Sequence, residues 1–275
     1  MLRSLFSGIS GLRGHQQMMD VTGNNIANVN TTGFKSSQVV FADALSQTLR
    51  GATAPGANTG ATNPAQIGLG VRTAGINTNF TQGATQVTGR KEDMLIQGDG
   101  MFVVNAGGQQ VYSRAGAMNF DAAGQLTTPD GGLVQGWMAV AGVVNTAGPL
   151  QPLVVDSSIY RSFSVSSDGS MNGLKADGTS EVIGQLAIAN FANPGGLEKA
   201  GGSLYRETIN SGVAQVGTAG QNGTGEVVSS ALEMSNVDLA QELTGLIIAQ
   251  RGFQANSKVI STSDELLQDL MNLKR

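Results

Sequence analysis

The amino-acid sequence predicts an α+β fold in which a mainly-β body is inserted between N- and C-terminal α-helices that pair as a coiled-coil-like stem. Three observations support this prediction. Apolar residues repeat every seven positions at both ends of the chain, short apolar runs alternate with turn sequences in the middle, and polar segments flank the middle. We therefore expect helical ends (1–30 and 233–275), extended connectors (31–74 and 210–232) and a β-rich domain (75–209).

Residues 1–30 have the pattern of an amphipathic helix with a narrow apolar stripe. Leu5, Leu12, Met19 and Ile26 follow a strict spacing of seven, and Ile9 adds to the apolar pattern. Three glycines in the first half of this segment weaken an isolated helix, each by about 1 kcal/mol relative to alanine. They also allow another backbone to approach. This helix therefore needs packing partners to be stable.

A longer amphipathic helix is expected within residues 233–275. Ser235 and Asn236 are favoured capping residues, and Asp238 suits the positive end of the helix dipole. One heptad column is apolar throughout: Leu239, Leu246, Phe253, Ile260 and Leu267. The neighbouring column is apolar only at its ends: Leu243, Gln250, Ser257, Asp264 and Met271. Because a self-sufficient two-stranded coiled coil needs two apolar columns, this helix suits a bundle with mixed neighbours.

The middle of the chain has the pattern of short β-strands. Apolar runs such as 101–104 and 184–189 are separated by Asp-Gly pairs, for example at 130–131 and 168–169. Asp-Gly between apolar runs is a strong hairpin signal. Segments rich in Gly, Ala, Thr and Asn lie on both sides of this region and predict the two connectors.

The composition argues against an enzyme or a cofactor-binding protein. The chain has no cysteine and one histidine, His15, so a catalytic triad or a multi-histidine metal site would depend on that residue alone. The segment Gly68-Leu69-Gly70 lacks the third glycine of a dinucleotide fingerprint, and the aspartates in turns lack calcium-loop spacing. We predict no catalytic residue, no cofactor and no metal.

Charge and hydropathy limit the possible partners. The net charge is −4 and there is no basic block, which disfavours nucleic acid. No apolar run approaches the roughly 18–20 residues of a membrane span. The apolar N-terminus is interrupted by Ser7, Gly8, Ser10 and Gly11, so we expect no cleaved signal peptide. From pattern alone, the terminal helices could complete a monomer core or mediate polymerisation, and the β body could be an adhesin or enzyme scaffold.

Two long motifs resemble the bacterial flagellar rod and hook axial proteins. The first is DVTGNNIANVNTTGFK, residues 20–35, which contains Asn24, Asn25, Asn28, Gly33 and Phe34. The second begins as EMSNVDL at residue 233 and continues as AQRGFQANSK at residue 249, and it contains Asn236, Gln250, Arg251, Asn256 and Ser257. The segments GDGMFVV and YSRAGAMNF in the β body are also similar to this family. The resemblance covers nearly the whole chain.

The resemblance implies a non-enzymatic structural subunit. We expect a short hook protein that polymerises into a helical tube and acts as a flexible universal joint between motor and filament. In this prediction the terminal helices line the inner tube, and the β domain forms the outer layer. The subunit interface would consist of apolar positions on the terminal helices: Leu5, Ile9, Leu12, Met19, Ile26, Leu239, Leu243, Leu246, Phe253, Ile260, Leu267 and Met271.

The alternative is a distal rod protein, which forms a rigid drive shaft. Distal rod proteins resemble this sequence throughout, whereas many hook proteins are longer than this chain.

The resemblance also implies the partners and the location. They are other copies of the chain, the rod, the hook cap, the hook–filament junction proteins and the flagellar type III export apparatus. The subunit would be exported to the extracellular hook without a cleaved signal peptide.

Overall fold

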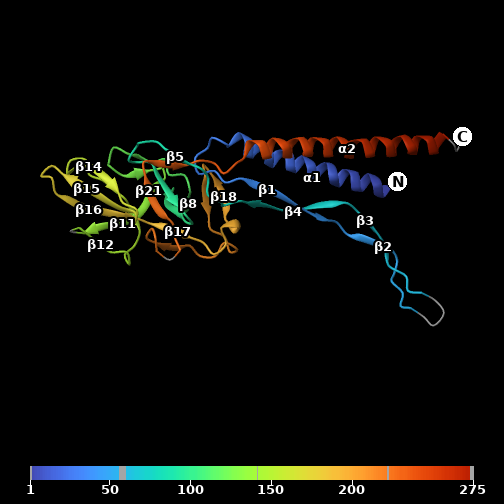
Figure 1. Cartoon of the computed structure of the whole chain (residues 1–275), viewed down its shortest axis with the longest axis horizontal. Helices are drawn as coiled ribbons and strands as arrows, with labels where there is room; N and C mark the ends of the chain where they lie inside the picture. The colour runs from blue at the N-terminus through green and yellow to red at the C-terminus, as the bar shows by residue number, and fades with distance from the viewer. Residues whose placement is uncertain (1, 56–59, 141, 222, 273–275) are drawn as a thin grey trace. The chain divides into compact units, whose positions relative to one another are not determined.

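The computed structural model describes residues 2–55, 60–140, 142–221 and 223–272, and it confirms the predicted α+β fold (Figure 1). The chain divides into two compact units. The helical unit comprises Met1–Ala27, Ser37–Thr78 and Asp238–Arg275, and the β unit comprises Asn28–Ser36 and Asn79–Val237. The chain therefore passes between the two units four times.

The helical unit is built on two helices, α1 (Leu2–Ala27) and α2 (Leu239–Asn272). They pack antiparallel, because Gly8 of α1 faces Ile260 of α2, whereas His15 faces Gly252. At 1.5 Å per residue, α2 is about 50 Å long. The predicted pairing of the two chain ends as a helical stem is therefore present within this unit.

The N-terminus of α2 is capped by Asp238. Its Oδ1 accepts hydrogen bonds from the backbone N–H groups of Ala240 (2.8 Å) and Gln241 (3.2 Å). The expected caps, Ser235 and Asn236, lie before the helix. The Asn236 side chain instead bonds inside the β unit. A carboxylate at the N-cap satisfies free N–H groups and suits the helix dipole, which explains the position of the first turn.

The rest of the helical unit is a two-stranded antiparallel ribbon. Four strands form two successive ladders, in which β1 pairs with β4 and β2 with β3: β1 (Ser37–Asp43), β2 (Ser46–Arg50), β3 (Ala65–Gly68) and β4 (Val71–Thr78). The sequence predicted an extended connector over 31–74, and the structure differs. β-branched and aromatic residues in β1 and β4 favour strand pairing, which was hidden by the glycine-rich segment between them.

The β unit is made of short antiparallel strands. In chain order they are β5 (Thr85–Val87), β6 (Met94–Gln97), β7 (Met101–Ala106), β8 (Gln109–Ser113), β9 (Asn119–Phe120), β10 (Leu126–Thr127), β11 (Leu133–Val140), β12 (Val143–Val144), β13 (Gln151–Pro152), β14 (Tyr160–Val165), β15 (Ser170–Lys175), β16 (Ser180–Leu186), β17 (Ile188–Asn190), β18 (Glu198–Gly201), β19 (Leu204–Arg206), β20 (Gln215–Gly217), β21 (Glu226–Ser229) and β22 (Ala231–Glu233). One 3₁₀ turn, η1 (Pro194–Gly196), precedes β18. The largest sheet has the order β14-β15-β16-β11-β7-β8-β19-β18, and β21–β6 and β22–β5 form separate pairs.

Strand β7 separates the two hydrophobic cores of the β unit. Its side chains alternate, so Phe102 joins one buried cluster, whereas Met101 and Val103 join the other. The first cluster includes Leu186, and the second includes Trp137. This alternation explains why the run that begins at residue 101 is apolar at every position and not at every second one.

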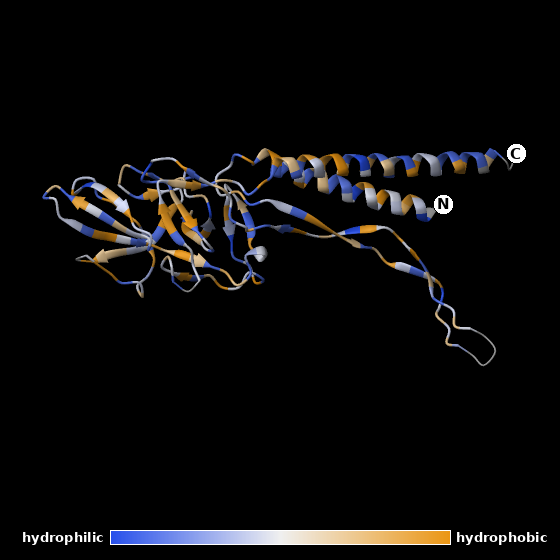
Figure 2. Ribbon diagram, in the orientation of Figure 1, coloured by the Kyte–Doolittle hydropathy of each residue, from blue (hydrophilic) through white to orange (hydrophobic). Residues whose placement is uncertain are grey.

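The β unit is larger than the β-rich domain predicted over 75–209. Residues 210–232, expected to be a connector, contribute β20, β21 and most of β22, and Val227 is buried in a core. The segment 28–36 also belongs to this unit. Among the described residues, no helix is long and apolar enough to span a membrane; polar and apolar residues alternate along both helices (Figure 2).

Candidate assembly interface

The seam between α1 and α2 is made of glycines that receive side chains from the opposite helix. A Cβ added to Gly252 would lie 2.4 Å from the ring of His15, and one added to Gly11 would lie 2.7 Å from Oδ1 of Asn256. About one turn before Gly252 on α2, Ala249 is fully buried. Small residues at these positions let the backbones approach closely. Gly8 and Gly11, two of the glycines that weaken α1 in isolation, are therefore part of the surface on which α2 packs, whereas Gly14 faces Phe41 of the ribbon.

This seam leaves most large apolar side chains of both helices outside it. None of the twelve predicted interface residues is fully buried within this chain. The half-buried ones are Leu5, Leu12, Met19, Ile26, Leu246, Ile260 and Leu267, and the exposed ones are Ile9, Leu239, Leu243, Phe253 and Met271. These exposed apolar positions are free to contact another molecule, which a helix packed wholly inside a monomer core would not allow.

The prediction missed several exposed apolar residues on the same helices. Ile247 and Ile248 are 56% and 57% exposed, and Phe6, Val259 and Leu266 are exposed as well. A strict spacing of seven selected residues in fixed columns, although an α-helix drifts against a seven-residue repeat. The run Leu246-Ile247-Ile248 was the signal available in the sequence, because three adjacent apolar residues cannot all face one partner.

The antiparallel ribbon carries a second set of exposed apolar side chains. Leu45 is 82% exposed, and the others are Val40, Phe41, Leu49, Ile67 and Ile76. A two-stranded ribbon in water gains little stability from its own pairing. Exposed apolar residues along such a ribbon are suited to contact with another chain.

Asn25 of the N-terminal motif joins three elements of the helical unit. It is buried, and its Nδ2 donates to the carbonyl of Ser37 (2.8 Å) and to Oε1 of Glu242 (2.8 Å). Its Oδ1 accepts from the backbone N–H of Ser37 (3.0 Å). The end of α1, the start of β1 and the first turn of α2 are thereby fixed to one another.

The other residues of the N-terminal motif shape the segment that follows α1. Gly33 has a positive φ of 67°, and a Cβ there would lie 2.5 Å from the backbone nitrogen of Ala115, so glycine is required. The ammonium of Lys199 lies 5.1 Å from the ring centroid of Phe34. Asn28 accepts a hydrogen bond from Thr31 Oγ1, and Asn24 is exposed.

In the C-terminal motif, Asn256 packs on Gly11, and its Nδ2 donates to the carbonyl of Gly252 at 2.9 Å. Gln250, Arg251 and Ser257 lie exposed on α2. These three side chains are therefore placed where another molecule can reach them, and Arg251 also contacts Gln254 on the same helix.

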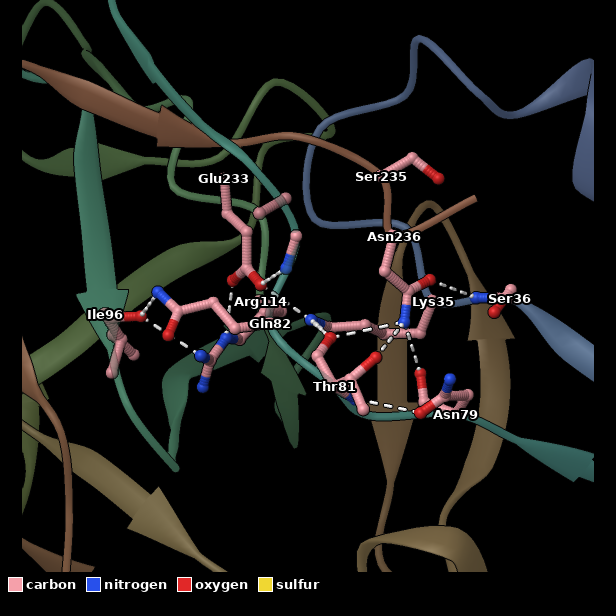
Figure 3. Close-up of polar contacts among 12 residues, drawn as sticks. Lys35, Ser36, Asn79, Thr81, Gln82, Ile96, Arg114, Glu233, Ser235 and Asn236 are labelled. Carbon is pink, nitrogen blue, oxygen red and sulfur yellow. Dashed lines mark hydrogen bonds and ion pairs between the residues drawn. The ribbon is translucent and has the colours of Figure 1, made fainter. Parts of the chain in front are cut away.

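The sequence prediction missed the most buried charged group of the molecule. In the β unit, Glu233 accepts from Lys35 Nζ (2.7 Å), from Arg114 Nε (2.6 Å) and from the backbone N–H of Gly83 (2.9 Å) (Figure 3). The side chain of Glu233 is 1% exposed, and both cations are buried. We name Lys35, Arg114 and Glu233 the buried ion cluster.

The buried ion cluster holds two cations and one anion, and backbone carbonyls complete it. Arg114 donates to the carbonyls of Ile96 (3.0 Å), Gly98 and Gly100, and Lys35 donates to the carbonyl of Thr81 (2.8 Å). Burial alone would raise the pKa of Glu233, but the two cations outweigh it and lower that pKa. Burial lowers the pKa of Lys35 despite its bond to Glu233.

Asn236 forms a second network beside the buried ion cluster (Figure 3). Its Oδ1 accepts from the backbone N–H of Ser36 (2.8 Å), and its Nδ2 donates to the carbonyls of Asn79 (2.9 Å) and Thr81 (3.2 Å). Three segments that leave the β unit are thereby bonded to each other within it. Lys35 ends the first motif and Glu233 begins the second. In a chain with few charged residues, this position of two opposite charges was the sequence signal that could have indicated the ion pair.

The described residues include no group of three or more His, Cys, Asp or Glu side chains that could hold a metal ion. The features of this molecule that concentrate near its motifs are packing surfaces and a structural ion cluster. They are suited to assembly.

Comparison with known proteins agrees with the two motifs. Residues 5–35 match the family described as flagella basal body rod protein, and residues 95–173 match the flagellar hook protein FlgE/F/G D1 domain. Residues 228–273 match the flagellar basal body rod FlgEFG protein C-terminal family. A flagellar basal-body rod protein FlgG of Bacillus subtilis is 49% identical over 276 residues, which cover all of both chains. The chain belongs to the flagellar rod and hook axial protein family.

Rod and hook relatives both match this axial protein over all or nearly all of its length. The flagellar basal-body rod protein FlgG of Agrobacterium fabrum is 41% identical over 268 residues, covering 96% of this chain and 97% of the relative. The flagellar hook protein FlgE of Treponema pallidum is 31% identical, covering all of both chains. That alignment spans 463 residues, so the hook relative carries insertions that this 275-residue chain lacks.

Proposed function

We propose that this axial protein is a subunit of the flagellar rod, the rigid drive shaft that was the alternative in the sequence prediction. The observation that carries the proposal is the end-to-end match to rod relatives of the same length, at 49% identity in the Bacillus subtilis case. The hook expectation has weaker support, because the hook relatives are less similar and longer.

The subunit polymerises through its helical unit. The seam between α1 and α2 uses small residues, and the larger apolar side chains face outward, where neighbouring copies would cover them. Burying a leucine or isoleucine side chain contributes about 1.5–3 kcal/mol, so a few such positions in each contact suffice for a stable polymer. Contacts that join different surfaces of successive copies and do not close into a ring produce a helical filament.

The ribbon of β1–β4 offers a second contact to neighbouring copies. Its exposed apolar residues extend the contact surface of the helical unit beyond the two helices. A subunit held at both the helices and the ribbon would slide less readily than one held at the helices alone, which suits a rigid shaft.

The remaining partners follow from this role. The subunit would contact other copies of itself and the adjoining axial proteins of the rod and hook, and it would reach them through the flagellar export apparatus. The proposal assigns it no enzymatic activity. Its place would be the basal body and not the extracellular hook.

Immunogold electron microscopy of isolated hook–basal bodies tests the assignment, with an antibody raised against the β unit and gentle opening of the envelope rings. Label on the straight rod is the expected result. Label on the curved segment outside the envelope would transfer the assignment to the hook and leave the polymerisation argument in place. Label on neither would contradict both.

A further inference from the structure

The buried ion cluster of the β unit carries one more positive charge than negative charge. Lys35 and Arg114 reach the single carboxylate of Glu233 from different sides, and all three side chains are buried (Figure 3). The backbone carbonyls that complete the cluster are dipoles, so they accept hydrogen bonds without cancelling a full charge. An ion taken out of water needs an opposite charge to offset its lost hydration. The cluster therefore lacks one anion.

Two hydrogen-bond donors of the cluster have no acceptor among the residues that the structure describes. An ammonium group has three N–H donors, and Lys35 Nζ uses two of them, on Glu233 and on the carbonyl of Thr81. A guanidinium group has five N–H donors, and Arg114 uses four of them, on Glu233 and on three backbone carbonyls. Each cation therefore has one donor left for a further acceptor.

A small cavity in the β unit adjoins both cations. It has a volume of about 30 Å³, and its wall includes Lys35, Arg114, Asn190 and Asp99. This volume gives room for a single ion about the size of a water molecule. Asp99 does not supply the missing charge, because its side chain is exposed and, in the described part of the chain, forms no ion pair with either cation.

We propose that this cavity is a binding site for one small monovalent anion, with chloride as the ligand, held between Lys35 and Arg114. The anion accepts the remaining N–H of each cation and brings the net charge of the buried ion cluster to zero. A halide suits this position, because it is a single atom that accepts hydrogen bonds from any direction. Chloride then stabilises the β unit by mass action, since it binds the folded state and not the unfolded one. The site does not depend on the assignment to rod or hook.

The pKa of Lys35 reflects the excess of positive charge in the cluster. Burial lowers this pKa, and the charge of Arg114 lowers it further, whereas Glu233 opposes both effects. An anion bound beside the two cations acts in the same direction as Glu233. It therefore favours the charged form of Lys35, on which the ion pair with Glu233 depends.

Urea unfolding of the dilute full-length protein, followed by the fluorescence of Trp137 in the β unit, tests the proposal. Sodium chloride replaces sodium gluconate at constant ionic strength, so that general screening of charges stays the same. As chloride rises from about 5 to about 500 mM, the unfolding equilibrium constant should fall on the order of tenfold for half-saturation near about 50 mM, and further for tighter binding. An unfolding constant that does not change with chloride would overturn the proposal.

Lys35→Gln is the variant that removes the site, because it leaves Arg114 and Glu233 as a one-to-one pair without excess charge. It should unfold with no dependence on chloride. Glu181→Gln removes a partly exposed ion pair with Lys175 and is the matched control, which should keep the chloride dependence of the parent. Equal chloride dependence in Lys35→Gln and the parent would also overturn the proposal, because the effect would then be a general action of the salt.

A second variant keeps the proposal testable if Lys35→Gln does not fold. Asp99→Asn removes a negative charge from the cavity wall at an exposed position, so it should lower the chloride concentration at half-saturation several-fold. An unchanged half-saturation would place the binding elsewhere and contradict the proposed site. Chloride NMR of the parent should show line broadening that bromide reverses, and no broadening would contradict binding. None of these measurements involves polymerisation, so their failure is distinct from failure of the rod assignment.

Discussion

Glu233→Gln is the substitution for which the structure gives the sharpest expectation. The side chain keeps its volume and one acceptor oxygen but loses its charge, while Lys35 and Arg114 stay buried beside it. The change therefore isolates the charge of Glu233 from its packing. We expect the β unit to be strongly destabilised and the fold to be retained under mild conditions.

The magnitude follows from the three hydrogen bonds to Glu233, which range from 2.6 to 2.9 Å. Removing one partner of a buried ion pair costs about 3–5 kcal/mol, because the remaining charge stays uncompensated. Since glutamine still accepts one hydrogen bond, we expect the lower end, about 3 kcal/mol. In a unit of this size that corresponds to a decrease in Tm of about 6–12 °C.

The assay is urea and thermal unfolding of the full-length protein, followed by the fluorescence of Trp137, which lies in a core of the β unit. The matched control is Glu181→Gln, because the ion pair of Glu181 with Lys175 lies partly exposed on the same unit and such pairs contribute little to stability. Equal unfolding midpoints for the two variants would show that the stability of the cluster does not depend on the charge of Glu233.

Three further predictions concern the titration of Glu233 and the exposed apolar residues of α2 and the ribbon. The pKa of Glu233 is lowered in the folded protein. The carboxylate of Glu233 therefore stabilises the fold fully above pH 4.5, the ordinary pKa of glutamate, and this stabilisation is lost as the pH falls through the lower pKa of the folded state. Acid unfolding should show this loss in the parent protein and not in Glu233→Gln, and the same acid response in both proteins would contradict the prediction. Phe253→Asp puts a charge on the outer face of α2. Sedimentation should then show no polymers, while the stability of the monomer stays unchanged. Normal polymers would show that neighbouring copies do not cover this face. Leu49→Ser on the ribbon should raise the concentration at which polymers form and leave unfolding of the β unit unaffected; an unchanged concentration would remove the ribbon from the contact.

Helix pattern and turn chemistry predicted the main elements of this fold. The heptad columns predicted both terminal helices, because apolar periodicity follows directly from helix geometry. Asp-Gly pairs such as Asp168-Gly169 and Asp177-Gly178 marked hairpins, and both glycines have the positive φ that such turns require. These signals are local, so a single sequence displays them.

Features that depend on distant partners could not be predicted in the same way. The ribbon strands β1 and β4 pair across a long glycine-rich segment, and β21 pairs with β6 from the far end of the chain. Lys35 and Glu233 bond to each other but are separated by 198 residues in the chain, so neither residue reveals its partner in the sequence. The seam between α1 and α2 was missed because glycine and alanine columns have no apolar signal, although they mark where backbones come close.

Electron cryomicroscopy of the assembled axial structure, at a resolution that traces side chains, would show whether the helical unit joins neighbouring subunits. We expect neighbouring copies to cover Ile247, Ile248 and Phe253, which are exposed in the single chain, and the β units not to supply the main contact. A polymer in which these three side chains face solvent, with subunits joined through their β units, would contradict assembly through the helical unit.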